Sequence, residues 1–137
     1  MKKNILLLFL LICAIFNAQK VKFRDNKLII DDKEVLSYLK TPKINEVTFY
    51  KLNTKDELFF IKYDQNGTFN YDGDNFVKLY FAKQDIKIES KSLRYGGVAG
   101  SELIKKLVSD GILQTDGTIN EEKLNIFYHK FNDYIIK

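Results

Sequence analysis

The sequence of 137 residues predicts an α+β fold, in which an antiparallel β-meander of about six or seven strands precedes two C-terminal helices packed on the sheet. From about residue 20 to 90, short β-type segments alternate with connections of two to five polar residues. Such connections join antiparallel neighbours, because parallel pairing needs long crossovers. After residue 100, two segments carry apolar residues at helical spacing. Strands followed by helices are typical of this fold class.

The first 18 residues have the pattern of an export signal. Two lysines precede an apolar run from Ile5 to Phe16, which is too short for a membrane span of roughly 20 residues. Ala18 is a suitable small residue before a cleavage point, although Phe16 is large for its position two residues earlier. We therefore expect a signal peptide at 1–18 and a single globular domain at 19–137.

The junction "NAQK" at residues 17–20 resembles the signal ends of exported proteins of Bacteroidetes, especially flavobacteria. The resemblance covers the signal alone, so it implies an exported protein, periplasmic or secreted, and no activity. Cys13 offers an alternative, a lipoprotein anchored through its thiol. A lipid-modified cysteine normally follows a small residue, whereas Ile12 precedes Cys13, so we expect ordinary cleavage and no stable membrane span in the mature chain.

The charge of the mature chain is close to balanced. Cleavage removes two of the 22 basic residues and none of the 18 acidic ones, which leaves 20 basic residues and a net charge of +2. Only Arg24 and Arg94 are arginines and the lysines are scattered, so we expect no nucleic-acid partner, which requires concentrated positive charge. With Cys13 removed, the mature chain has no cysteine, which excludes disulfides and cysteine-based zinc sites.

Seven segments have the composition and length of strands. In chain order they are "VKF", "KLII", "EVLSYL", "EVTFYKL", "ELFFIKY", "FVKLYFA" and "IKIES". The fifth is apolar on both faces, with Leu58 and Phe60 opposite Phe59 and Ile61. We expect such a strand at the centre of the sheet and covered on both sides, with the helices as one cover.

The two helices are predicted over about 100–110 and 120–135. Their apolar stripes are Leu103, Ile104, Leu107 and Val108 in the first, and Leu124, Phe127, Tyr128, Phe131, Tyr134 and Ile135 in the second. Ser101 is the expected N-cap of the first helix, and Gly111 is expected just after its last turn. Either Asn120 or the Thr118–Glu121 pair can cap the second helix.

The segment "YDQNGTFNYDGDNF", Tyr63 to Phe76, is the most ligand-like part of the chain. A calcium-binding EF-hand loop needs Gly at position 6 and Glu at position 12, and the registers starting at Asp64 and at Asn70 supply neither. The Asn-Gly and Asp-Gly pairs instead predict two tight turns around a short strand, "TFNY". We expect no metal site in this segment.

Other candidate sites also have structural explanations. The glycine-rich "RYGGVAGSE" lacks both the phosphate-loop lysine and the GxGxxG spacing, so we expect a hinge there. His129 is the only histidine and falls on the polar side of its helix. The acidic pairs Asp31–Asp32 and Glu121–Glu122 fall in a predicted turn and a first helical turn, where such residues are common. We therefore assign no catalytic, cofactor-binding or metal-binding residue.

The tyrosines are the remaining candidates for function. Five of them fall on predicted strands or turns, namely Tyr38, Tyr50, Tyr63, Tyr71 and Tyr80. Tyrosine provides contact area at low entropic cost, so an exposed sheet face lined by these residues could bind a protein.

The leading hypothesis is an exported, non-enzymatic binding module with a protein partner, in an inhibitor, immunity-type or envelope-accessory role. The alternative is a carrier of a small apolar ligand, held between sheet and helices in a cavity lined by Phe59, Ile61, Phe81 and the aromatic residues of the second helix. A filled core there would count against it. A carboxylate-based hydrolase is a third hypothesis, and it needs two acids converging in one cleft.

Overall fold

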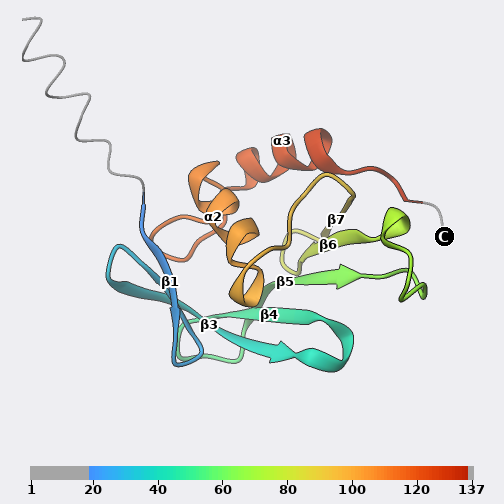
Figure 1. Ribbon diagram of the computed structural model, residues 1–137. Helices are drawn as coiled ribbons and strands as arrows, with labels where there is room; N and C mark the ends of the chain where they lie inside the picture. Colours follow the sequence, from blue (N-terminus) through green and yellow to red (C-terminus); the bar gives the residue numbers. More distant parts are fainter. Residues whose placement is uncertain (1–18, 136–137) are drawn as a thin grey trace, which may run out of the picture.

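The computed structural model describes residues 19–135, in which a seven-stranded sheet is followed by two α-helices (Figure 1). The strands are β1 (Val21–Arg24), β2 (Lys27–Ile30), β3 (Lys33–Thr41), β4 (Glu46–Lys51), β5 (Glu57–Asp64), β6 (Phe76–Phe81) and β7 (Ile86–Ser90). The helices are α2 (Ser101–Ser109) and α3 (Glu121–Phe131), with short 3-10 turns η1 (Pro42–Ile44), η2 (Asp72–Asp74) and η3 (Val98–Gly100). The predicted α+β fold is confirmed. The predicted signal peptide, with Cys13, lies outside the described residues.

The sheet is an antiparallel meander whose strands are ordered β1 to β7, as in the sequence. Its tightest turns follow from residues that tolerate a left-handed backbone. Asp25 and Asn26 have φ of 51° and 59°, and Asp31 and Asp32 have φ of 50° and 65°. Two-residue hairpin turns require this conformation at both positions, which explains the pairing of β1 with β2 and of β2 with β3. Within residues 19–135, no helix is long and apolar enough to cross a membrane.

One face of the sheet packs against both helices and forms the core. Phe49, Phe59 and Phe81 lie side by side on β4, β5 and β6, with ring centroids 4.7 and 5.3 Å apart and no exposed surface. The helical residues buried against the sheet are Leu103, Ile104, Leu107 and Val108 of α2 and Leu124 and Phe127 of α3. Helix α2 contacts β1 and α3 contacts β7, so the sheet curves around the two helices (Figure 1).

The other face of the sheet carries no helix, which corrects the prediction that the central strand is covered on both sides. In β5, Phe59 and Ile61 are fully buried, whereas Leu58 and Phe60 are half-buried. Charged residues are paired across this outer face in the order Glu46, Lys62, Lys78 and Glu89. The aliphatic stems of the lysines can shield neighbouring apolar surface while the ammonium groups stay hydrated, so the face needs no further layer.

The predicted cap of α3 is confirmed and that of α2 is wrong. The side chain of Asn120 accepts a hydrogen bond from the backbone N–H of Lys123 at 3.0 Å, which selects it over the Thr118–Glu121 pair. Ser101 is already helical, and Gly100 precedes it with φ of 70° and no capping side chain. A Cβ at Gly100 would collide with the side chain of a β5 residue. The helix therefore begins after a glycine that lies close against the sheet, and no side chain caps it.

Helix α2 ends as predicted, but α3 is shorter than the predicted 120–135. Gly111 follows α2 with φ of 73°, as a left-handed C-terminal residue should. Helix α3 stops at Phe131 because the next residues pair with β7. The side chain of Asn132 accepts from the Glu89 N–H at 3.0 Å, and the Asp133 N–H donates to the Glu89 carbonyl at 2.8 Å. These bonds cover a strand edge that would otherwise be open.

The segment "TFNY" is not a strand, which corrects the prediction of a short strand between two turns. The connection between β5 and β6 is a loop at 65–75 that includes η2. Asp64 pairs directly with Phe76, so the flanking strands are already joined and leave the loop no partner. The Asp74 carboxylate instead accepts from the Thr68 hydroxyl at 2.7 Å and from the Asn66 amide at 3.3 Å. The acids of this segment thus stabilise the loop itself.

Candidate functional site

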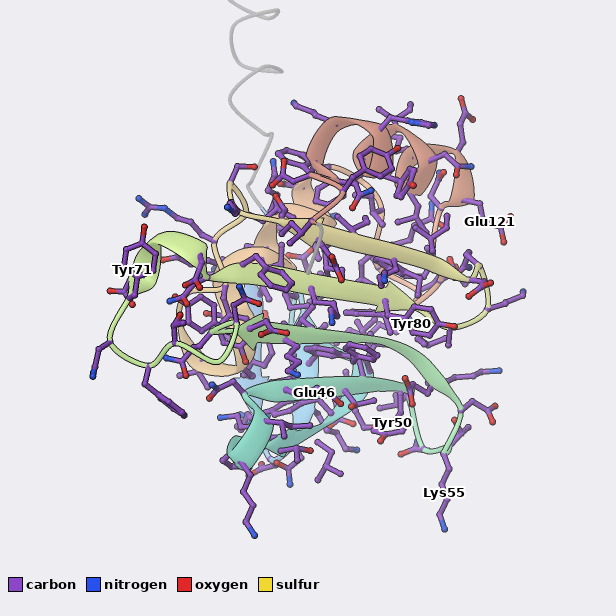
Figure 2. The ribbon with its side chains drawn as sticks, turned by 90° about the vertical axis from the view of Figure 1, so that its right-hand side faces the viewer. Glu46, Tyr50, Lys55, Tyr71, Tyr80 and Glu121 are labelled. Carbon is purple, nitrogen blue, oxygen red and sulfur yellow. The ribbon has the colours of Figure 1, made fainter. Side chains whose placement is uncertain are left out.

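Successive connections of a meander alternate between the two ends of the sheet. The β2–β3, β4–β5 and β6–β7 turns therefore lie at one end, which we call the groove end, and the α2–α3 loop lies there too. Lys55 and Glu121 mark this end in Figure 2, and Tyr71 marks the opposite end. Segments that are far apart in the sequence are thus brought together at the groove end.

Two β-bulges shape the sheet at the groove end. Leu28 pairs with Leu36 but Ile29 pairs with Glu34, so Val35 is left unpaired in β3. In the same way Phe49 pairs with Phe59 and Tyr50 with Glu57, which leaves Leu58 of β5 without a partner in β4. A bulge redirects a side chain and often lies next to a functional site. Val35 and Leu58 both line the groove.

The α2–α3 loop forms the opposite wall and rests on the β3 bulge. Gly117 has φ of 84°, and a Cβ there would lie 3.1 Å from the Val35 carbonyl oxygen. The next residue, Thr118, donates from its backbone N–H to the Asp116 carboxylate at 3.0 Å, and its hydroxyl lies 2.6 Å from the same oxygen. These hydrogen bonds, the hydroxyl first, lower the pKa of Asp116, with a smaller contribution from the charge of Lys33. Asp116 is therefore held as an anion at the lip of the groove.

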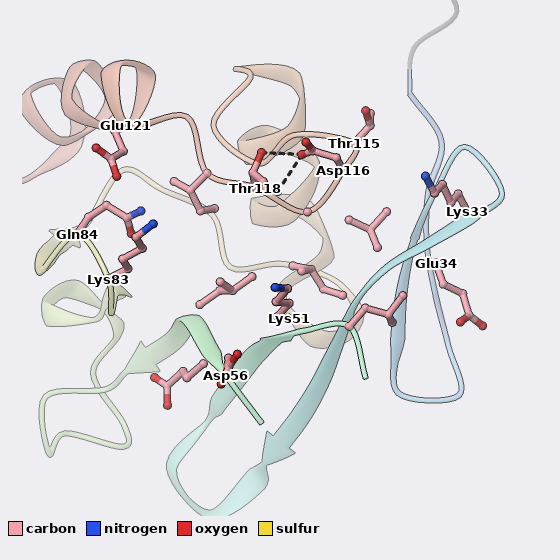
Figure 3. Close-up of a pocket in the computed structure, with 17 residues that line it drawn as sticks. Lys33, Glu34, Lys51, Asp56, Lys83, Gln84, Thr115, Asp116, Thr118 and Glu121 are labelled. Carbon is pink, nitrogen blue, oxygen red and sulfur yellow. Dashed lines mark hydrogen bonds between the residues drawn. The ribbon is translucent and has the colours of Figure 1, made fainter. Parts of the chain in front are cut away.

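The groove has a volume of about 730 Å³ and runs between the bulged strands and the α2–α3 loop (Figure 3). Its floor is apolar and consists of Val35, Leu36, Leu52, Leu58 and Ile119. The first two are buried, whereas the other three are partly exposed. The groove therefore presents apolar surface to solvent at the one end of the sheet where the ladder is irregular.

The rim of the groove carries charges of both signs. The basic residues are Lys33, Lys51 and Lys83, and the acidic residues are Glu34, Asp56, Glu57, Asp116 and Glu121. Glu34 pairs with Lys27 at 2.8 Å. Among residues 19–135, none of the other rim charges makes an ion pair within 4 Å. Figure 3 shows the labelled charged side chains spread around the groove, with the lysines between acids of the two walls. With Glu34 paired, four acids remain against three lysines, so the rim is slightly negative.

One buried polar atom also lies in this wall. The Gln84 side-chain oxygen is inaccessible to solvent and has no hydrogen-bond partner within the described part of the chain. Gln84 belongs to the β6–β7 turn and lines the groove. A buried acceptor without a donor is unfavourable by about 1–3 kcal/mol, so this turn carries a local polar cost beside the groove.

The five tyrosines predicted to line one sheet face do not share one, which corrects that expectation. Tyr38 is buried in the core against Phe49. Tyr63 packs on Tyr95 and accepts a hydrogen bond from the Asn75 amide at 2.9 Å. Tyr71 is exposed on the loop at the far end. Only Tyr50 and Tyr80 lie on the outer face, and Tyr80 donates to the Asp85 carboxylate at 3.0 Å, which raises its pKa.

The geometry counts against the predicted carrier cavity and against the predicted acidic pairs as a hydrolase site. The residues predicted to line a carrier cavity, Phe59, Ile61 and Phe81, are fully buried, and Phe59 stacks between Phe49 and Phe81. The acidic pairs Asp31–Asp32 and Glu121–Glu122 are exposed and lie on separate segments. The acids that do share one cleft are those of the groove rim, so a carboxylate-based hydrolase would have to use the groove itself. Residues 19–135 contain no group of three or more His, Asp or Glu side chains suited to hold a metal ion. His129 is exposed on α3.

No protein-family model, curated protein or solved structure matches this chain. The groove is therefore interpreted from its own geometry. Sequence reasoning did not identify it, although a signal was present. Val35–Leu36 is an adjacent apolar pair, and Leu58–Phe59 begins a run of four apolar residues. Such pairs are typical of bulges as well as of strands covered on both faces.

Proposed function

We propose that this chain is an exported, non-enzymatic binding module and that its groove binds a segment of a partner protein. The proposal is carried by one observation, an apolar floor surrounded by charges of both signs that, Glu34 excepted, make no ion pair in the described chain. Export is supported by the pattern of the first 18 residues. An inhibitor, immunity-type or envelope-accessory role would each require a surface that binds another protein.

The floor favours an apolar side chain as the anchor of the partner segment. Leu52, Leu58 and Ile119 are partly exposed, and covering them would remove apolar area from water at roughly 25 cal/mol per Å². A small, purely apolar ligand would gain from the floor but would bring its surface against the charged rim. Burying charges without partners is unfavourable, so a segment that also carries polar groups fits the groove better.

The rim indicates the charge of that segment. Asp56, Glu57, Asp116 and Glu121 outnumber the lysines and make no ion pair with described residues. Charge complementarity steers association and rejects unsuitable partners more than it adds affinity. The groove therefore suits a segment in which basic residues flank an apolar anchor.

Site-specific photocrosslinking in the native cell envelope tests this proposal. A benzophenone amino acid would replace Leu52, on the groove floor, or Ile126, which is exposed on α3 away from the groove. We expect one protein to crosslink at position 52 and not at 126. In affinity pull-downs with protein that carries no benzophenone, Leu52→Glu should abolish capture of the same partner, and the matched Ile126→Glu should not. Equal crosslinking at both positions, or full capture by Leu52→Glu, would show that the groove is not the binding site.

A further inference from the structure

The end of the sheet opposite the groove carries an unusual set of exposed apolar side chains. Of seven large apolar residues that are exposed in the described chain, four lie on loops at this end and none on the turns of the groove end. The four are Ile44, Phe69, Tyr71 and Val98. Phe69 and Tyr71 are 82% and 63% exposed. Exposed apolar groups gathered in this way mark an interaction surface.

Three separate loops contribute to this surface and lie next to one another. The Asn45 carbonyl, just after η1, accepts from the Tyr63 N–H at 3.1 Å, which places η1 beside the end of β5 where loop 65–75 begins. Asp72 of that loop and Arg94 of loop 91–100 line the same depression. We call 40–45 (the last two residues of β3 with η1 and Asn45), 65–75 and 91–100 the apolar loops. Figure 2 shows Tyr71 projecting from them, away from Lys55 and Glu121.

The loop that carries Phe69 is held from within, so the exposure of Phe69 does not follow from a lack of local structure. The Thr68 N–H donates to the Gln65 carbonyl at 2.9 Å, and the Tyr71 N–H donates to the Thr68 carbonyl at 3.2 Å. The Thr68 hydroxyl also donates to Asp74 at 2.7 Å. These bonds close the base of the loop and leave Phe69 at its tip. The fold thus holds an aromatic ring in water without using it in the core.

The charges of the apolar loops are asymmetric. They contain four basic residues, Lys40, Lys43, Lys91 and Arg94, and two acidic residues, Asp72 and Asp74. None of the four cations makes an ion pair with any residue between 19 and 135. The two acids are hydrogen-bonded inside their own loop, Asp74 to Thr68 and Asp72 to the Asn75 amide at 3.1 Å. The loops therefore offer free positive charge beside exposed aromatic rings.

We propose that the apolar loops dock on the surface of an anionic lipid bilayer, independently of the groove at the other end. Aromatic side chains favour the boundary between headgroups and acyl chains, and nearby lysine and arginine attract anionic headgroups. If the partner were a protein, we would expect a pocket for Phe69 on that protein or an apolar pocket between the loops of this chain. The depression between the loops is no apolar pocket, because charged residues such as Asp72, Arg94 and Glu102 line it beside apolar ones. Separate projecting side chains suit a deformable surface that needs no matching pocket.

The chain contains no tryptophan, so a single Trp reports its own surroundings. We would place it at Phe69 or, as a matched control, at Ile126, which is 62% exposed on α3. The chain from Gln19 onward holds every described strand and helix. It would be mixed with vesicles of phosphatidylethanolamine and phosphatidylglycerol. We expect F69W emission to shift to shorter wavelength and to be quenched by brominated acyl chains, with no change in I126W. Unchanged F69W emission, or equal shifts in both variants, would overturn the proposal.

Co-sedimentation with the same vesicles gives a second test. Phe69→Ser should lower the association constant for vesicles about tenfold or more, because the apolar side chain that would insert between headgroups and acyl chains is removed. Ile126→Ser should leave this constant unchanged. Lys43→Glu with Arg94→Glu should weaken binding, and Lys55→Glu, at the groove end, should not. Matching thermal unfolding curves would exclude misfolding. Binding that is insensitive to Phe69→Ser, or capture of a protein through Phe69 with no vesicle binding, would refute bilayer docking.

Discussion

Replacing Gly117 by Ala tests whether the α2–α3 loop is seated on the β3 bulge, as the groove requires. Gly67 provides a matched control, because it has a similar backbone conformation in different surroundings. The two glycines have φ of 84° and 77°. A Cβ at position 117 would lie 3.1 Å from the Val35 carbonyl oxygen and 3.3 Å from the Leu36 side chain, whereas one at position 67 would meet nothing within 4 Å. Both substitutions strain the backbone, and only one crowds the groove wall.

The expected losses of unfolding free energy follow from the backbone strain and the steric crowding. A left-handed conformation is unfavourable for an L-residue by about 1–2 kcal/mol, and alanine offsets about 0.4–1 kcal/mol of this by restricting the unfolded chain. Gly67→Ala should therefore lower the free energy of unfolding by about 1 kcal/mol. Crowding against a backbone oxygen adds about 1–3 kcal/mol. Gly117→Ala should accordingly be less stable than Gly67→Ala by about 1–3 kcal/mol, or roughly 4–12 °C in Tm.

Urea unfolding followed by circular dichroism would measure both variants, with the slope m showing whether unfolding stays two-state. The photocrosslink at position 52 should also weaken in Gly117→Ala and persist in Gly67→Ala. Equal losses of stability in the two variants would refute the reasoning. In that case the α2–α3 loop does not rest on Val35, and the groove wall is not built as described.

Three further predictions concern the core, a helix cap and a rim carboxylate. Phe59→Ala should lower the free energy of unfolding by about 3–5 kcal/mol in urea titrations, because Phe59 lies fully buried between two rings; a loss below about 1 kcal/mol would contradict this packing. Asn120→Ala should lower it by about 1 kcal/mol and Asn120→Ser by less, since serine can also cap. Asp116 has a lowered pKa, so its hydrogen bonds stabilise the fold above its unfolded pKa and are lost as pH falls through the lower, folded value. An NMR titration should place that pKa below 3.8, and Thr118→Val should raise it.

The strands and helices could be predicted because their signals are local. Two-residue turns such as Asp31–Asp32 and the helical stripe from Leu103 to Val108 each depend on neighbouring residues. The shortening of α3 could not be predicted in this way. It depends on hydrogen bonds between Asn132 and Glu89, 43 residues apart. A helix stripe in the sequence cannot show that a distant strand edge competes for the same backbone.

The direction of each tyrosine depends on strand register, which residue type does not reveal. Tyr38 pairs with Phe49 and both point into the core, so the adjacent Tyr50 must point to the outer face. A shift of the strand register by one residue would place Tyr50 in the core and Phe49 on the outer face. The bulge at Leu58 is a further case, because the same apolar run could equally have belonged to a strand covered on both faces. Faces, bulges and the groove are therefore properties of pairing, and pairing is non-local.

The meander itself nevertheless limits where a site can form. Because connections alternate between ends, the turns near residues 31–33, 51–57 and 82–85 must meet at one end, whatever their side chains. Loops 40–45, 65–75 and 91–100 must meet at the other. The first set is short and carries charges around apolar residues, and the second is longer and carries exposed aromatic rings. When the loops are grouped by the end of the sheet at which they lie, their compositions distinguish two candidate surfaces on one small domain. If each binds as proposed, the domain would hold its partner segment at the end of the sheet that faces away from the bilayer.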